Sequence, residues 1–188
     1  FSRSRGLGDV YKRQIRRQIS FMRECQLKIK KIFAICWGLQ VAVTVAGGQV
    51  KKSDKGAHRG IAHNIKVNNI GSNHKIYLDK KRQFNSPAFN FDEVVKIPEG
   101  ATLLSSNELN NVMGLNFKTN KSDIWGIQYH PEITYEKMVS LIHFRKERLL
   151  NKGAFKDQDE INNHILMIEN EIKNTEKISR MKAVSYTH

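Results

Sequence analysis

The chain has 188 residues, with 32 Lys and Arg against 18 Asp and Glu, and a formal net charge of +14. Its hydrophobic fraction of 39% is sufficient for one buried core, which excludes a mostly disordered chain. No apolar run approaches the roughly 20 residues that cross a bilayer, and two cysteines exclude a disulfide scaffold. We therefore expect a single globular, cytoplasmic domain that does not insert into a membrane.

The first third of the chain predicts a helix, a strand, a sharp turn and a second helix. Apolar residues at steps of three and four over 15–29 indicate an amphipathic helix. The apolar run over 31–35 indicates a buried strand, and the small apolar residues over 38–46 indicate a helix that ends at Gly47-Gly48. This alternation is typical of an α/β protein.

The middle of the chain is rich in turns and in short β-type runs, and the last part predicts helices. The predicted strands cover residues 60–67, 75–78, 101–106, 112–118 and 124–129. Thr134 can cap a helix whose apolar stripe runs from Met138 to Leu149, and another helix is predicted over about 157–180. The isoleucines of that last helix share one face, which we assign to the domain's own core rather than to a docking surface. The elements together predict an α/β sandwich with a β-rich excursion.

Both ends of the chain lack apolar periodicity. The strings GDVYKRQ near the start and VSYTH at the end resemble translated sequencing-adapter sequence. Residues 1–14 and 183–188 are therefore interpreted as non-native segments and set aside from the fold prediction. On this interpretation the natural protein extends upstream of residue 15.

Cys36 lies where a buried strand must turn abruptly into a helix, with small residues, Ala34 and Gly38, two positions to either side. Such an elbow holds its apex residue in a strained conformation and exposes its side chain. Position 36 also lies at a helix N-terminus, which favours a thiolate. Cys36 is thus a candidate nucleophile with the Trp37 amide as oxyanion donor; the alternative is a core cysteine, as we expect for Cys25.

The string IFAICWGLQ around this cysteine resembles the nucleophile segment of the class I glutamine amidotransferases, whose pattern is G-x-C-x-G-x-Q. Gly38 and Gln40 match this pattern, while Ala34 replaces its first glycine with another small residue. The resemblance implies that Gln40 helps to hold the substrate glutamine. The alternative is an ordinary polar residue in the first helical turn.

His130 lies in the string GIQYHPE, which resembles the H-P-E sequence that ends the catalytic domain of the same family. Residues two apart in an extended chain project to the same side, so Glu132 can reach the imidazole, and Pro131 stiffens the spacing. These strings predict a triad in which Cys36 attacks, His130 is the base and Glu132 orients the ring. The other histidines lack such a context and are expected at the surface, namely His58, His63, His74, His143, His164 and His188.

A third stretch, SPAFNFDEVV, resembles the family's S-H-x-D-E-V region beside the glutamine pocket. Asp92, Glu93 and Val94 align, while Phe89 and Asn90 occupy the places usually held by Ser and His. The resemblance makes Asn90 and Asp92 candidates for binding the amino-acid end of the substrate. Turn-forming Asn and Asp residues would explain the same letters equally well.

The resemblance covers about residues 15–150, which we interpret as a partial amidotransferase domain followed by a helical extension over 151–182. The strings WGLQ and GAHRGIAHNI favour the stand-alone branch similar to the amidotransferase part of GMP synthase. The resemblance implies a flavodoxin-like α/β fold, a three-layer sandwich with a mainly parallel central sheet, whose first strand or strands would be missing from this chain.

The implied reaction is thiolate attack on the glutamine side-chain amide, release of ammonia, and hydrolysis of a γ-glutamyl thioester to glutamate. A close alternative keeps the triad but cleaves γ-glutamyl bonds in small peptides or conjugates. The family's second oxyanion donor would lie upstream of residue 15, so we expect this chain to hydrolyse glutamine poorly or to fold poorly. Equal turnover by a version extended upstream would contradict that expectation.

The basic charge is left unexplained by the enzymatic interpretation. The Lys-rich strings KKSDK, LDKKRQ and FRKER make nucleic-acid binding the rival from another class. A further non-enzymatic alternative is an interaction module in which the isoleucine stripe of 161–172 docks on a synthase partner. No nucleic-acid-binding motif accompanies them, so we interpret the charge as solvated surface. No metal-ligand cluster or nucleotide-binding glycine loop is evident, and no cofactor or metal is predicted. The expected partners are glutamine or a γ-glutamyl small molecule, and an unidentified synthase that accepts ammonia.

Overall fold

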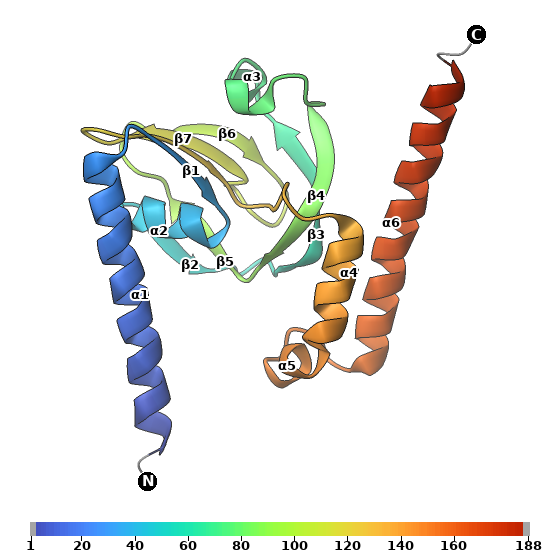
Figure 1. Ribbon diagram of the computed structural model, residues 1–188, viewed down its shortest axis with the longest axis horizontal. Helices are drawn as coiled ribbons and strands as arrows, with labels where there is room; N and C mark the ends of the chain where they lie inside the picture. The colour runs from blue at the N-terminus through green and yellow to red at the C-terminus, as the bar shows by residue number, and fades with distance from the viewer. Residues whose placement is uncertain (1–2, 186–188) are drawn as a thin grey trace.

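The strand-to-helix turn at Cys36 connects the main sheet to the helix packed against it (Figure 1). The computed structural model describes the backbone of residues 3–185 and the side chains of residues 13–174. Strand β1 (Lys31–Ile35) leads through Cys36 into helix α2 (Trp37–Val45), in agreement with the prediction.

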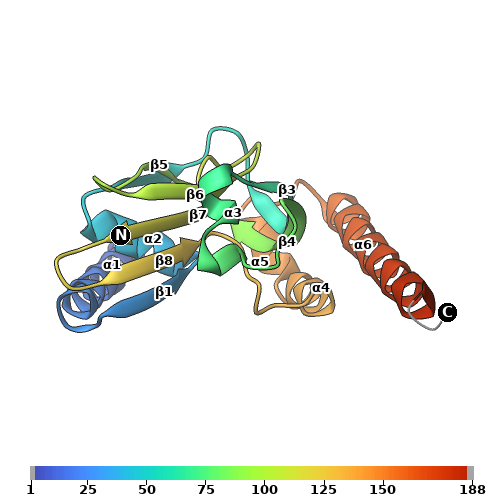
Figure 2. The same ribbon diagram turned by 90° about the horizontal axis from the view of Figure 1, so that it is seen from above.

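Six strands form the main sheet in the order β1-β8-β7-β6-β3-β4 (Figures 1 and 2). Besides β1, this sheet contains β3 (His58–Val67), β4 (Gln83–Asn90), β6 (Thr102–Ser106), β7 (Gly114–Lys118) and β8 (Asp123–Ile127). A separate two-stranded ribbon pairs β2 (Gln49–Lys52) with β5 (Asp92–Lys96) in antiparallel orientation.

The α/β class is confirmed, but the expectation of a mainly parallel sheet needs a correction. Strands β1 and β8 are parallel, whereas the other neighbouring strands of the described sheet pair antiparallel. A parallel pair needs a long crossover connection, while β7 and β8 are joined only by residues 119–122. The short connections in this part of the chain therefore make the sheet mixed.

The helices are α1 (Arg3–Lys28), α3 (Asn69–Ser72), the 3-10 helix η1 (Lys75–Tyr77), α4 (Tyr135–Phe144), α5 (Lys146–Asn151) and α6 (Gln158–Ser185). In the part of the chain that the structure describes, no helix has both the length and the apolar character needed to cross a membrane. Figure 2 shows α1 and α6 at opposite ends of the molecule.

Three elements differ from the prediction. Helix α1 begins at Arg3, inside the segment 1–14 that was set aside because it lacks apolar periodicity and resembles adapter sequence. The predicted strand over 75–78 is η1, whose first turn is capped by the ring of His74 accepting from the Ile76 amide. The predicted helix after Thr134 is divided at Arg145 into α4 and α5. Residues 186–188, at the end of the second excluded segment, lie outside the described residues.

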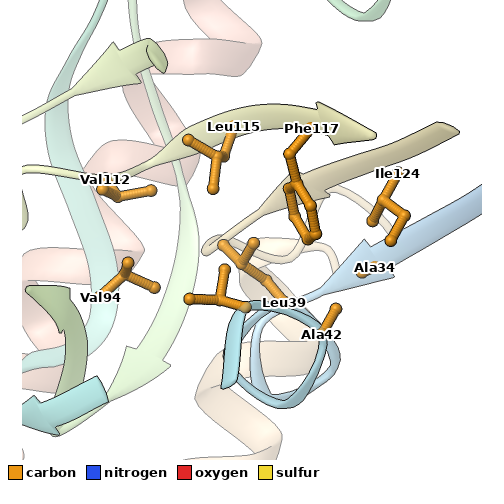
Figure 3. Close-up of a cluster of buried hydrophobic side chains, with 9 residues drawn as sticks. Ala34, Leu39, Ala42, Val94, Val112, Leu115, Phe117 and Ile124 are labelled. Carbon is orange, nitrogen blue, oxygen red and sulfur yellow. The ribbon is translucent and has the colours of Figure 1, made fainter. Parts of the chain in front are cut away.

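A core cluster holds α2 against the sheet (Figure 3). Its buried members come from β1, α2, β5, β7, β8 and the loop before β7, and they include Ala34, Leu39, Ala42, Val94, Val112, Leu115, Phe117 and Ile124. Gly126 of β8 allows the close approach, because a Cβ at this position would lie 2.4 Å from Cδ1 of Leu39. This packing brings the start of α2 next to the end of β8.

Helix α6 lies beside α4 in both views (Figures 1 and 2). Ile161, Ile165 and Ile168 are buried in one core cluster with Met138 and Ile142 of α4. The interpretation of the isoleucine stripe as part of the domain's own core is therefore confirmed.

Candidate active site

Cys36 has a backbone conformation that is rare for a residue other than glycine. Its φ and ψ angles are 51° and −109°. Its amide donates to the carbonyl of Ile127 at 2.7 Å, which ties the turn to the end of β8. A strained residue of this kind persists only where its surroundings hold it in place, and such residues concentrate at functional sites.

His130 follows β8 and is fixed at both its backbone and its side chain. Its amide donates to the carbonyl of Pro87 at 2.7 Å. Its Nδ1 lies 2.6 Å from Oε1 of Glu132, so the ring donates from Nδ1 to the carboxylate. The two side chains are 21% and 49% exposed, which leaves the imidazole accessible but oriented.

The side chain of Cys36 acts on His130 across the long sequence separation. It is the main cause that raises the pKa of His130 to about 9; Glu132 raises this pKa further, and burial opposes both. The imidazole is therefore protonated at neutral pH, which places a positive charge next to Cys36. The structure thus brings together the three residues predicted as a triad.

Trp37 follows Cys36 as the first residue of α2. Its amide is among the first-turn donors that have no carbonyl partner within a helix, and it directly follows the candidate nucleophile. Its indole Nε1 donates to Oε1 of Gln18 at 2.8 Å, which connects α1 to the elbow.

Gln128 is a residue of the site that the sequence analysis missed. It is fully buried, and its Nε2 donates to Sγ of Cys36 at 3.4 Å. Its Oε1 accepts from Nε2 of Gln40 at 3.1 Å, and Gln40 also donates to the carbonyl of Asp92 at 3.0 Å. The available signal was a polar amide two residues before His130, on the same side of an extended chain. Gln40 thus contacts Cys36 through Gln128.

The other two predicted substrate-binding residues lie next to Gln40. Asn90 is buried, and its Nδ2 donates to the carbonyl of Asp92 at 2.9 Å while its Oδ1 lies 3.0 Å from Nδ1 of His58. Asp92 therefore enters this network through its backbone carbonyl, which receives both Gln40 and Asn90.

The expectation that all remaining histidines lie at the surface is wrong for His58. His58 is 1% exposed, with its ring nitrogens hydrogen-bonded to Asn90 and Asn107, and burial lowers its pKa. A neutral ring with both nitrogens bonded can be buried at low cost. His63 and His143 are exposed and His74 and His164 are half-buried, while His188 lies outside the described residues.

A cavity of about 270 Å³ opens beside His130. Its apolar lining comes from β4 and from the segment that includes α4 and α5, through Phe89, Ile133, Met138, Leu141, Ile142 and Leu149. Phe89 connects the cavity to Cys36, because its carbonyl oxygen lies 4.0 Å from Sγ of this residue. The lining also includes the exposed Arg145.

Replacing Gln128 with leucine should slow alkylation of Cys36 at neutral pH by about tenfold. The substitution removes a donor to the sulfur, and hydrogen bonds to charged groups contribute about 1.5–3 kcal/mol. The rate of iodoacetamide modification, measured by mass spectrometry in a Cys25→Ser background, tests this effect. Gln158→Leu, at the start of α6, is the matched control, and equal rates in the two variants would contradict the prediction.

Comparison with known proteins decides the family. Residues 4–147 match the family model described as glutamine amidotransferase class-I. The chain belongs to the class I glutamine amidotransferase family. The family resemblance found in the two strings around Cys36 and His130 is thereby confirmed.

Within the glutamine amidotransferases, the chain is similar to proteins with different names. It is 30% identical over 142 residues to a γ-glutamyl-L-1-hydroxyisopropylamide hydrolase from a Pseudomonas species, covering 74% of this chain and 48% of that protein. It is also 30% identical over 112 residues to a protein of Methanocaldococcus jannaschii named as one of the subunits of glutamine-hydrolysing GMP synthase, covering 55% of this chain and 52% of that protein. The chain spans about half the length of these curated relatives.

A solved structure supports the same fold. The crystal structure of a glutamine amidotransferase from Thermotoga maritima matches with a TM-score of 0.64 at 20% identity, over 88% of this chain and 66% of that one. At this level of identity the match shows a shared fold.

Proposed function

We propose that this amidotransferase domain hydrolyses the side-chain amide of glutamine, with Cys36 as nucleophile, His130 as acid and base, and Glu132 as the residue that orients the ring. The observation that supports the proposal is the placement of His130 between two partners: its Nδ1 lies 2.6 Å from Oε1 of Glu132, and Cys36 is the main cause of its raised pKa. A thiolate paired with an imidazolium is the reactive form of a cysteine hydrolase.

The proposed reaction has two halves. The thiolate attacks the side-chain carbonyl carbon, and the oxyanion that forms is stabilised by the amide of Trp37. The C–N bond then breaks as the imidazolium gives its proton to the leaving nitrogen, which releases ammonia and leaves a γ-glutamyl thioester. In the second half, neutral His130 takes a proton from water, hydroxide attacks the thioester, and the release of glutamate restores the ion pair.

The hydrogen bonds around Gln40 support an indirect role in substrate binding, in which Gln40 holds neighbouring residues in place. Gln40 and Asn90 both donate to the carbonyl of Asp92, and Gln40 also binds Gln128 behind the sulfur. We assign Gln40, Asn90 and Asp92 to the wall that shapes the site for the glutamyl group. The M. jannaschii relative is named as part of GMP synthase, and we propose a synthase that accepts the ammonia as the partner of this chain.

A second candidate reaction uses the same residues on γ-glutamyl conjugates, with an amine in place of ammonia as the leaving group. The apolar cavity beside His130 favours it, because ammonia has no apolar group to place there. The relative named as a hydrolase of a γ-glutamyl amide supports this candidate.

Covalent capture tests the common mechanism without requiring turnover. A diazoketone analogue of glutamine should modify one cysteine, Cys36, and free glutamine should slow the modification. Peptide mapping by mass spectrometry identifies the modified residue. The proposed function would be overturned if Cys25 were modified as fast as Cys36, or if neither glutamine nor any γ-glutamyl peptide protected Cys36.

A further inference from the structure

We infer that the apolar cavity beside His130 binds the amine half of the substrate, and that the preferred substrates are γ-glutamyl dipeptides whose second residue is apolar. The inference rests on the proposed function and names the substrate class of the same site. It assigns the leaving group a binding site formed by β4, α4 and α5, apart from the network around Gln40.

The chemistry of the leaving group determines where its substituent must lie. The leaving nitrogen takes its proton from His130, so this nitrogen must lie within hydrogen-bond distance of the imidazole, and its substituent begins there. His130 itself lines the cavity, and Phe89 contributes both a cavity wall and a carbonyl 4.0 Å from the sulfur of Cys36. Gln128, which also contacts the sulfur, is fully buried and leaves no room for a substituent at its own position. The cavity that His130 and Phe89 line is therefore the space that we assign to the amine half.

The composition of the lining indicates an apolar substituent. Six of the side chains around the cavity are apolar, and Met138, Ile142 and Leu149 are almost completely buried. A volume of about 270 Å³ is below that of most pockets for drug-sized ligands, which limits the occupant to a small group such as one amino-acid side chain. Ammonia, the leaving group of glutamine, would gain nothing from this lining, whereas a leucine side chain would leave water on entering it.

Arg145 indicates that the apolar amine carries a carboxylate. It lies at the junction of α4 and α5, it is exposed, and it belongs to the cavity lining. It takes part in none of the ion pairs found among residues 13–174, which join Lys28 to Glu24, Arg59 to Glu160 and His130 to Glu132. A guanidinium binds carboxylates with charge-assisted hydrogen bonds, and the leaving amine of a γ-glutamyl dipeptide carries a carboxylate on its α carbon.

The reaction on such a substrate needs water as its only co-reactant. The thiolate of Cys36 attacks the γ-carbonyl carbon, the amide C–N bond breaks, and His130 protonates the departing nitrogen. The free apolar amino acid leaves the cavity, and water hydrolyses the γ-glutamyl thioester to glutamate as in the glutamine reaction.

Protection of Cys36 against the diazoketone ranks the ligands of the full chain even where turnover is slow. The concentration that halves the rate of modification should be about tenfold or more lower for γ-glutamyl-leucine than for glutamine or γ-glutamyl-glycine. Removing apolar groups from a ligand that matches its pocket weakens binding by about that factor. Release of leucine, measured by mass spectrometry, should show the same order of kcat/KM. Equal protection by γ-glutamyl-leucine and γ-glutamyl-glycine would overturn the inference.

Arg145→Gln tests the carboxylate separately and replaces an exposed side chain. The variant should weaken protection of Cys36 by γ-glutamyl-leucine about three- to tenfold and should not change protection by γ-glutamyl-leucine amide, which lacks the carboxylate. The matched variant Arg148→Gln should change protection by neither ligand. Equal effects of Arg145→Gln on both ligands would overturn the assignment of Arg145. Protection by glutamine without any preference for leucine would refute only this inference, whereas failure of every γ-glutamyl compound to protect Cys36 would refute the proposed function as well.

Discussion

Replacing Cys36 with alanine should abolish covalent capture by the diazoketone and lower hydrolysis of glutamine or γ-glutamyl peptides by about 10³-fold or more. The thioester cannot form without the sulfur, and removal of a nucleophile from a triad typically costs several orders of magnitude in kcat. Because Cys36 is only half-buried and its side chain is small, the variant should keep its fold.

The matched control for this variant is Cys25→Ser, which changes the other free cysteine on helix α1. It should keep the capture and the turnover of the unmodified chain. Circular dichroism establishes that both variants are folded, and release of glutamate measures activity. Full activity in Cys36→Ala would exclude the proposed mechanism.

Replacing His130 with glutamine should lower turnover by a comparable factor and also change how stability depends on pH. The pKa of His130 is raised from 6.5 to about 9, first by Cys36 and then by Glu132. A group whose pKa is higher in the folded state contributes stability that is complete below pH 6.5 and is lost as the pH rises through about 9. We expect this contribution to be about 2 kcal/mol, since the exposed Glu132 is partly screened by solvent.

Urea unfolding at pH 6 and at pH 10 measures this contribution. The free energy of unfolding of the unmodified chain should exceed that of His130→Gln by more at pH 6 than at pH 10. His143→Gln, at an exposed position on α4, should follow the unmodified chain at both pH values. An equal difference between the unmodified chain and His130→Gln at both pH values would show that His130 carries no extra charge stabilisation in the folded state.

The geometry of the strings around Cys36 and His130 could be predicted from the sequence because it depends on residues only a few positions apart. Small residues on either side of Cys36 predict an elbow, and the structure has the predicted turn with a positive φ angle. Two residues separated by one proline predict a contact between His130 and Glu132, and their side chains are 2.6 Å apart. Backbone sterics over a few residues determine both features.

Other parts of the site depend on pairing between distant strands, and the sequence analysis missed them. Gln128 reaches the sulfur only because β8 pairs with β1 in a register that sets Ile127 opposite Ile35. His58 is buried because Asn90, from the neighbouring strand β4, and Asn107 supply partners for its ring. No local pattern specifies such partners, since they come from positions far away along the chain.

The amino-acid order alone specified the family, the elbow at Cys36 and the orienting pair of His130 and Glu132, because motif letters and short spacings encode local geometry. The mixed strand directions, the amide network behind the sulfur and the apolar cavity beside His130 came only from the packed chain. Each of these requires several segments to meet, and the free energy that selects their arrangement belongs to the whole core.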